Sequence, residues 1–268
     1  MIPKIIHYCW FGGKPLPTWA SDYINSWSKF CPDYQIIQWD ETNYDVTKIE
    51  YMKQAYELKK WGFVPDYARL DIIYTHGGIY LDTDVEIIKP FDKLLDEKGF
   101  AGFESDKYVA LGLGFGAEKG NPIIREMMTQ YESMSFIKDD GTLNLLASPS
   151  YSSEILKNYG YTMNGECQKG TYFSLYSKEF FCPQDFNTGA VNITDNTYSI
   201  HHYAATWHSI WDKAVFNIER CKNRNGIEYR IRRVFSLPFR IVNMINKKGL
   251  KKTFLFAVNK LKNLATID

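Results

Sequence analysis

The chain has 268 residues and a mass of 31.2 kDa, which suits one ordinary domain with an added segment and is too short for two full domains. Hydrophobic residues make up 45% and charged residues 24%, so a core can form and global disorder is excluded. The net charge is +1, no run of 18 apolar residues occurs, and the N-terminus lacks a signal-peptide pattern, so we expect neither a transmembrane helix nor a secretory leader.

The first 90 residues alternate strand-like and helix-like patterns. The expected strands are 4–10, 34–39 and 79–88, and the expected helices are 18–30, 49–58 and 66–76, the last of which ends at Gly77-Gly78. This alternation is typical of a three-layer α/β/α sheet built from βαβ units.

The signals from residue 100 onwards are weaker. Short strands are expected at 100–104, 113–117 and 198–203, and helices at 123–131, after Asn121-Pro122, and at 152–158. We expect one catalytic domain over residues 1–219. The five cysteines contain no CxxC pair, so we do not expect a zinc knuckle or a disulfide scaffold. The expected environment is the reducing cytoplasm.

Residues 220–268 differ in composition from the rest. They contain 13 Lys or Arg against two acids, a charge of +11, whereas the first 219 residues carry 19 against 29, a charge of −10. The basic residues alternate with apolar ones, which predicts two or three short amphipathic helices divided by Pro238 and Gly249. One hypothesis is that this segment binds an anionic membrane surface; the other is that its apolar side packs on the acidic body. Nucleic acid is not an expected partner.

The sequence Asp82-Thr83-Asp84 is the main candidate for chemistry. It follows an apolar strand, and ligands of open α/β sheets bind beyond the carboxyl ends of strands. Side chains at i and i+2 of a strand share a face, so both carboxylates are expected to meet one divalent cation. Two solvated acids in a turn are the ordinary alternative. A haloacid-dehalogenase-like phosphatase would need an earlier strand and Thr or Val where Glu86 stands, and a polymerase would need more basic residues nearby, so a nucleotide-sugar transferase fits best.

Three ordered segments together resemble glycosyltransferase family 32. They are IHYCWFGG from Ile6 to Gly13, DYAR from Asp66 to Arg69, and GGIYLDTD from Gly77 to Asp84. The family includes bacterial capsular and exopolysaccharide transferases and Golgi enzymes, with distant kinship to the glucosylating clostridial toxins. The resemblance implies a GT-A fold, a UDP-sugar donor, a divalent cation (Mn²⁺ or Mg²⁺) and transfer with retention of anomeric configuration.

The resemblance also implies roles for particular residues. Trp10 would stack on the nucleotide base, and Asp66 and Arg69, at i and i+3 of a helix, would bind the donor sugar. Arg69 would also stabilise charge at the scissile bond. Asp82 would contact ribose, sugar and metal, and Asp84 would ligate the metal directly. For each residue the alternative is structural: a core tryptophan, or a helical salt bridge.

A later run, His201-His202-Tyr203-Ala204-Ala205-Thr206-Trp207, resembles the motif that closes over the diphosphate. We expect His201, rather than His202, to be a third metal ligand, and Trp207 to cover the diphosphate. A plain histidine pair is the alternative. Ser148-Pro149-Ser150 occupies the place of a Thr-Gly-Pro near the acceptor. The sequence Gly112-Leu-Gly114-Phe-Gly116 lacks the spacing of a dinucleotide fingerprint, so we expect these glycines to let backbone approach the sugar.

The sequence therefore predicts a metal-dependent, retaining glycosyltransferase that moves a sugar from a UDP-sugar to a glycan or lipid-linked acceptor in polysaccharide or capsule synthesis. The expected location is cytoplasmic, and peripheral at the inner face of the cell membrane if the basic segment binds lipid. The competing hypothesis is a degenerate module that binds a nucleotide-sugar or glycan without turnover.

Overall fold

The structure is a computed structural model and describes residues 1–204, 210–219 and 226–248. It divides the chain into two compact units, one of residues 1–184 and 191–204 and one of the remaining residues. The predicted boundary lay after residue 219, whereas α7 (Ile210–Glu219) falls in the second unit because it packs against α8 (Ile227–Lys248).

The first unit is built on a mixed sheet. Within the described residues this sheet has eight strands in the spatial order β2-β1-β3-β7-β5-β9-β8, with β6 paired to β5. Its strands are β1 (Ile5–Cys9), β2 (Gln35–Trp39), β3 (Gly78–Tyr80), β5 (Gly99–Ser105), β6 (Tyr108–Ala110), β7 (Phe115–Ala117), β8 (Gln168–Lys169) and β9 (Ser174–Tyr176). β1 runs parallel to both β2 and β3, and β5 to β9, whereas β3–β7, β5–β7, β5–β6 and β8–β9 are antiparallel pairs. The predicted α/β class is confirmed, and the βαβ pattern holds for the first three strands.

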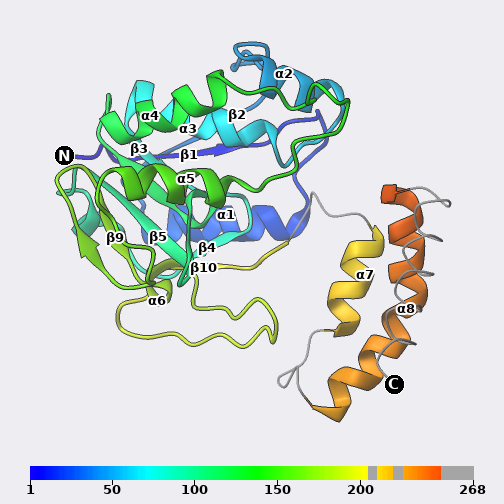
Figure 1. The fold of residues 1–268 in the computed structure, drawn as a ribbon. Helices are drawn as coiled ribbons and strands as arrows, with labels where there is room; N and C mark the ends of the chain where they lie inside the picture. The colour runs from blue at the N-terminus through cyan, green and yellow to red at the C-terminus, as the bar shows by residue number, and fades with distance from the viewer. Residues whose placement is uncertain (205–209, 220–225, 249–268) are drawn as a thin grey trace. The chain divides into compact units, whose positions relative to one another are not determined.

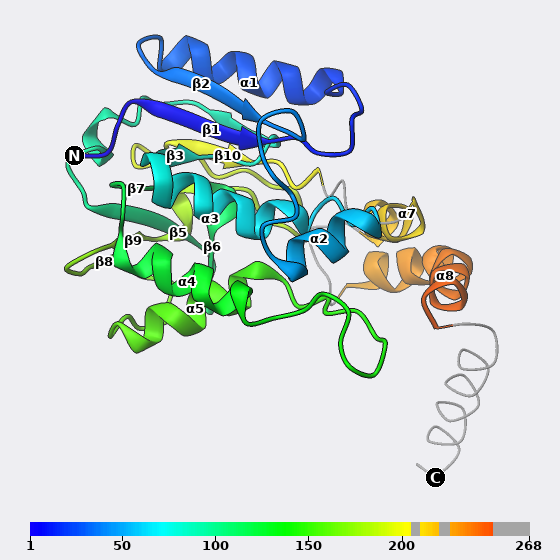
Figure 2. The same cartoon turned by 90° about the horizontal axis from the view of Figure 1, so that it is seen from above.

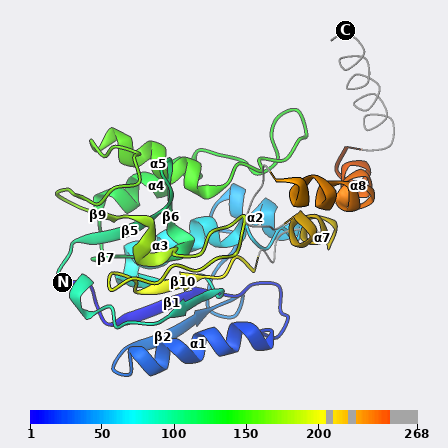
Figure 3. The ribbon, with the colours of Figure 1, turned by 90° about the horizontal axis from the view of Figure 1, so that it is seen from below.

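Helices cover both faces of this sheet. They are α1 (Thr18–Phe30), α2 (Glu50–Glu57), α3 (Val64–His76), α4 (Pro122–Glu132), α5 (Ser148–Asn158) and α6 (Lys178–Phe181). Figure 1 shows α3, α4 and α5 side by side, and Figures 2 and 3 show α1 running beside β1 and β2. A small second sheet pairs β4 (Val85–Ile87) with β10 (Ser199–His201), and β4 packs on α1.

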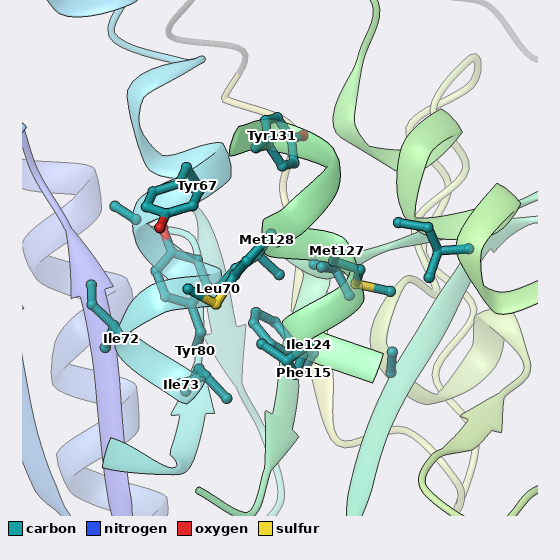
Figure 4. Close-up of a cluster of buried hydrophobic side chains, with 14 of the residues drawn as sticks. Tyr67, Leu70, Ile72, Ile73, Tyr80, Phe115, Ile124, Met127, Met128 and Tyr131 are labelled. Carbon is teal, nitrogen blue, oxygen red and sulfur yellow. The ribbon is translucent and has the colours of Figure 1, made fainter. Parts of the chain in front are cut away.

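Strand alternation divides the buried side chains between two cores. Along β3, Ile79 packs in the core with α1, and Tyr80 packs in the core with α3 and α4. Figure 4 shows the second of these cores, where Tyr80 and Phe115 lie beside Met128 of α4. The apolar helix stripes and the alternating strands predicted from the sequence therefore pack together in these two cores, and this packing fixes the positions of the strand ends.

The expected strand over residues 79–88 is wrong. It is two short strands in different sheets, β3 and β4, and Asp82-Thr83-Asp84 forms the turn between them. The backbone leaves the first sheet because the Asp82 N–H donates to the Gly112 carbonyl (3.2 Å) and the Val85 N–H donates to Asp82 (3.1 Å), which closes a turn. The two carboxylates therefore do not share the face of a strand, and their approach to one site has to come from the turn.

In the second unit α8 continues through Pro238, although the sequence pattern predicted a break there. The side chains of Ser236 and Arg240, on either side of the proline, both bond to Glu219 of α7, which anchors both halves of the helix. Among the helices that the structure describes, none is long and apolar enough to cross a bilayer. Gly249 lies outside the described residues.

Candidate active site

The candidate residues gather at the carboxyl ends of two parallel strands. Trp10 directly follows β1, and Asp82 and Asp84 follow β3, which is paired to β1. The first turns of α3 bring Asp66 and Arg69 to the same edge, since Arg69 lies within ion-pair distance of Asp82. The structure therefore brings Asp66, Arg69 and Asp82 together at this edge.

Arg69 is the centre of this cluster. Its Nη2 lies 3.3 Å from Asp66 Oδ1 and 3.5 Å from Asp82 Oδ1, and its Nε donates to the Pro65 carbonyl at 3.0 Å. Its guanidinium lies 5.1 Å from the centre of the Tyr80 ring, and the Tyr80 hydroxyl donates to Asp82 Oδ1 at 3.1 Å. Burial opposes the charge on Arg69, but the surrounding acids hold its pKa above the ordinary value. The guanidinium of Arg69 is therefore the positive partner of both the Asp66 and the Asp82 carboxylates.

Asp66 is the most deeply buried acid of the site, with 5% of its surface exposed. Burial raises its pKa to about 6, against the lowering effects of Arg69 and of a hydrogen bond from Ser148. Asp66 and Ser148 line a cavity of about 10 Å³, room for a single water molecule, together with Tyr131 and Tyr151. The structure thus brings the predicted Ser148 segment, at the start of α5, to the predicted sugar-binding acid.

Asp84 is held by His201, the last residue of β10, and by the backbone that follows it. Its Oδ1 lies 3.3 Å from Nε2 of His201, its Oδ2 accepts the Ala204 N–H at 2.8 Å, and its carbonyl accepts the His202 N–H at 2.9 Å. Burial alone would raise the pKa of Asp84, but His201 and these hydrogen bonds lower it, while Asp84 raises the pKa of His201 well above its ordinary value. Each partner of this pair therefore stabilises the charged form of the other.

The two neighbouring histidines face different partners. His202 Nε2 lies 2.8 Å from Glu86 Oε2, and the His202 ring stacks on Tyr23 with the centroids 4.3 Å apart. Of the two, His201 is the one whose side chain faces the Asp82-Thr83-Asp84 turn, as the sequence predicted.

Sequence reasoning missed the support behind His201. Tyr203 packs edge-on against the His201 ring at 4.4 Å, and its hydroxyl lies 2.8 Å from the Cys182 sulfur. Tyr203 has φ +53°, a left-handed conformation that costs a non-glycine residue energy. This conformation turns the chain so that the next residue, Ala204, donates to Asp84.

Gly112 lies against the candidate acids. A Cβ atom at this position would collide with Asp82 Oδ2 and lie 3.3 Å from Arg69 Nη1. The glycine therefore makes room for the carboxylate of Asp82; the expected approach of its backbone to a sugar stays a prediction. Tyr80 was likewise overlooked, because a tyrosine inside an apolar strand has no signal that separates a functional hydroxyl from a core ring.

Asp82 and Asp84 supply the carboxylate oxygens that Mg²⁺ and Mn²⁺ prefer. Asp82 is open to a ligand, with 31% of its side chain exposed. In the part of the chain that the structure describes, however, no three His, Cys, Asp or Glu residues lie close enough to hold an ion alone. The donor set fits a cation that takes its remaining oxygens from a bound diphosphate. The expected role of His201 as a third ligand stays a prediction.

The aromatic predictions have different outcomes. Trp10 is half-buried, and its Nε1 donates to the Lys14 carbonyl at 2.6 Å, so it is not a fully buried core residue. Its stacking on a base stays a prediction. Trp207 lies outside the described residues.

The segment that contains most of the candidate site is similar to known proteins. Residues 17–101 match a family described as "Glycosyltransferase sugar-binding region containing DXD motif". Two curated relatives are from Schizosaccharomyces pombe. Inositol phosphoceramide mannosyltransferase 3 is 27% identical over 143 residues, 50% of this chain, and inositol phosphoceramide mannosyltransferase 1 is 29% identical over 127 residues, 41% of this chain. This chain spans 38% of the length of each relative.

Among solved structures, a PaToxG glycosyltransferase is 18% identical and superposes with a TM-score of 0.46 over 59% of this chain and 68% of its own. The capsular subgroup and the kinship to clostridial toxins that the sequence suggested stay predictions. The segment that holds Asp66, Arg69, Asp82 and Asp84 is similar to the DXD-containing sugar-binding region of glycosyltransferases, which supports the predicted enzyme class.

Proposed function

We propose that the chain is a metal-dependent glycosyltransferase that takes a sugar from a UDP-sugar, retains its anomeric configuration, and passes it to a glycan or lipid-linked acceptor in polysaccharide synthesis. The observation that carries this proposal is the Arg69 cluster. A buried guanidinium joins Asp66 to Asp82 at the carboxyl edge of the sheet, inside the segment similar to the sugar-binding region.

Each group in the cluster suits one part of a nucleotide-sugar. Carboxylate oxygens of Asp66 would accept hydrogen bonds from sugar hydroxyls, and Arg69 would donate to the oxygen that gains charge as the glycosidic bond breaks. Trp10 would stack on the base. Asp82 and Asp84 would hold a divalent cation, which would neutralise the diphosphate as it leaves.

The relatives refine the choice of substrates to test. Both are named as inositol phosphoceramide mannosyltransferases. Mannose is therefore added to the donor sugars to be tested, and a lipid to the candidate acceptors. A cytoplasmic enzyme at the inner face of the cell membrane would meet both nucleotide-sugar donors and lipid-linked acceptors.

The test is release of nucleotide from UDP-Glc, UDP-Gal, UDP-GlcNAc, UDP-GalNAc and GDP-mannose, with Mn²⁺ and with EDTA. We expect release from one donor with Mn²⁺ and none with EDTA. Asp84→Asn should abolish it, because an amide brings no charge to the cation. Asp195→Asn, which makes the same change on an exposed loop of the first unit, should leave it intact.

Three outcomes would contradict the proposal. Full activity in EDTA, or full activity of Asp84→Asn, would remove the metal role. Donor binding in a thermal-shift assay without release from any donor would favour the non-catalytic binding module. Retention is tested separately by NMR of the product anomer. A glycosyl-enzyme adduct trapped in mass spectrometry would show that retention proceeds through a covalent intermediate.

A further inference from the structure

Within the described part of the second unit, helix α8 carries an apolar stripe on the side that faces away from α7. The outer stripe consists of five residues that are 45–73% exposed: Ile227, Ile231, Val234, Phe235 and Ile241. Their spacing of 4, 7, 8 and 14 residues from the first places them on one side of an α-helix. Isolated exposed apolar residues are ordinary, but a continuous stripe over four turns is a mark of an interaction surface.

The opposite side of α8 packs on α7 through several polar contacts and one pair of aromatic rings, Trp211 and Phe239. Ser236 is fully buried and donates to Glu219, and Arg240 reaches both oxygens of Glu219 at 2.6 Å through Nε and Nη2. Arg232 donates to the Ile218 carbonyl at 3.2 Å. These polar contacts and the Trp211–Phe239 ring contact hold α8 to α7, and packing within this helix pair leaves the outer stripe uncovered.

The charge of α8 has one sign. Residues 227–248 contain six Arg or Lys and one Glu, a net charge of +5. Arg230 and Arg233 are exposed and lie along one border of the outer stripe, at positions between those of its members. A partner that binds this surface must therefore offer apolar groups to the stripe and negative charges to the arginines at its border.

We propose that the outer stripe of α8 lies in the interface of an anionic lipid bilayer, with the helix axis parallel to the membrane. Acyl chains would cover the aliphatic and aromatic side chains, and phosphate groups would face Arg230 and Arg233. A second copy of the chain fits less well, because a symmetric pair would bring two helices of charge +5 together. Residues 227–248 span about 33 Å, so the stripe would contact the interface along most of the helix.

The test is co-sedimentation of the full chain with vesicles of phosphatidylcholine alone or with 30% phosphatidylglycerol. We expect binding to the anionic vesicles only. The double variant Val234→Glu with Phe235→Glu should lower partitioning into the vesicles more than about tenfold. Both residues are 69% exposed in the free protein, so the substitutions should affect membrane binding and not folding. The matched control is Val191→Glu with Ile193→Glu, the same added charge on exposed positions of the first unit, and it should bind as the wild type does.

The arginines are tested separately. Arg230→Gln with Arg233→Gln should lower partitioning about 30-fold at low salt and weaken its salt dependence. Equal binding to neutral vesicles, or equal loss in the matched control, would overturn the proposal. So would dimers in analytical ultracentrifugation that Val234→Glu with Phe235→Glu dissociates, because the stripe would then be a contact between copies. The readouts do not involve turnover, so a failed transferase assay leaves them interpretable.

Discussion

Replacing Asp66 by asparagine should make the protein more stable and less active. Burial raises the pKa of Asp66 from 3.8 to about 6. At neutral pH the carboxylate is charged, although its buried surroundings in the folded protein favour the neutral acid. The attraction of Arg69 is already part of that shift, and Arg69 keeps Asp82 as a partner after the substitution. Asparagine resembles the protonated acid in shape and charge.

The magnitude follows from linkage. Between about pH 4 and pH 6 the folded protein binds more protons at Asp66 than the unfolded chain does, so stability falls as the pH rises through this window. Two pKa units correspond to a loss of stability of about 3 kcal/mol, which is zero below about pH 4 and complete above about pH 6. Asp66→Asn should therefore raise the free energy of unfolding by about 3 kcal/mol at pH 8, a gain of roughly 6–12 °C in Tm, and change little at pH 4.

The assay is thermal or urea unfolding of both proteins at several pH values, with nucleotide release measured in parallel. Asp71→Asn is the control, since Asp71 lies on the same helix but accepts from Tyr44 at 2.7 Å and pairs with Lys48 at 2.5 Å. That variant should lose stability. If Asp66→Asn is destabilised like the control, or its gain does not depend on pH, the burial argument is wrong.

Three other variants test the surroundings of the motif. Gly112→Ala should keep the fold but lower turnover at least tenfold, because its Cβ displaces Asp82, and unchanged kinetics would contradict the packing argument. Trp10→Ala should weaken donor binding by about 1–3 kcal/mol in a titration, whereas an unchanged affinity would make Trp10 a structural residue. The predicted role of His201 as a third metal ligand means that His201→Gln should weaken Mn²⁺ binding in calorimetry, whereas unchanged binding would leave His201 only as the ion-pair partner of Asp84.

Much of the fold was predictable because it depends on local pattern. The stripe of α1 and the alternation along β1 mark buried faces, and their expected bounds agree with the structure to within one or two residues. The break between β3 and β4 was not predictable, because the apolar run continues through the acids and the turn depends on the distant Gly112 carbonyl. The partners of Asp84 were hidden for the same reason, since strand pairing brings residues 201–204 to it from more than 110 positions away.

The two acids of the motif occupy opposite environments, and this bears on how a donor would bind. Asp82 shares Arg69 with a second carboxylate, and burial raises its pKa; Asp84 faces His201 alone, and its pKa is lowered. Arg69 is fixed by Asp66, by the Pro65 carbonyl and by the Tyr80 ring, whereas the His201 ring contacts Asp84, the Cys182 thiol and the Tyr203 ring. Asp82 and Asp84 would hold a divalent cation, and Arg69, fixed by these contacts, would stay in place to meet the leaving diphosphate. Any change in the His201–Asp84 pair would instead act on the turn of residues 201–204, which also donates two backbone N–H groups to Asp84.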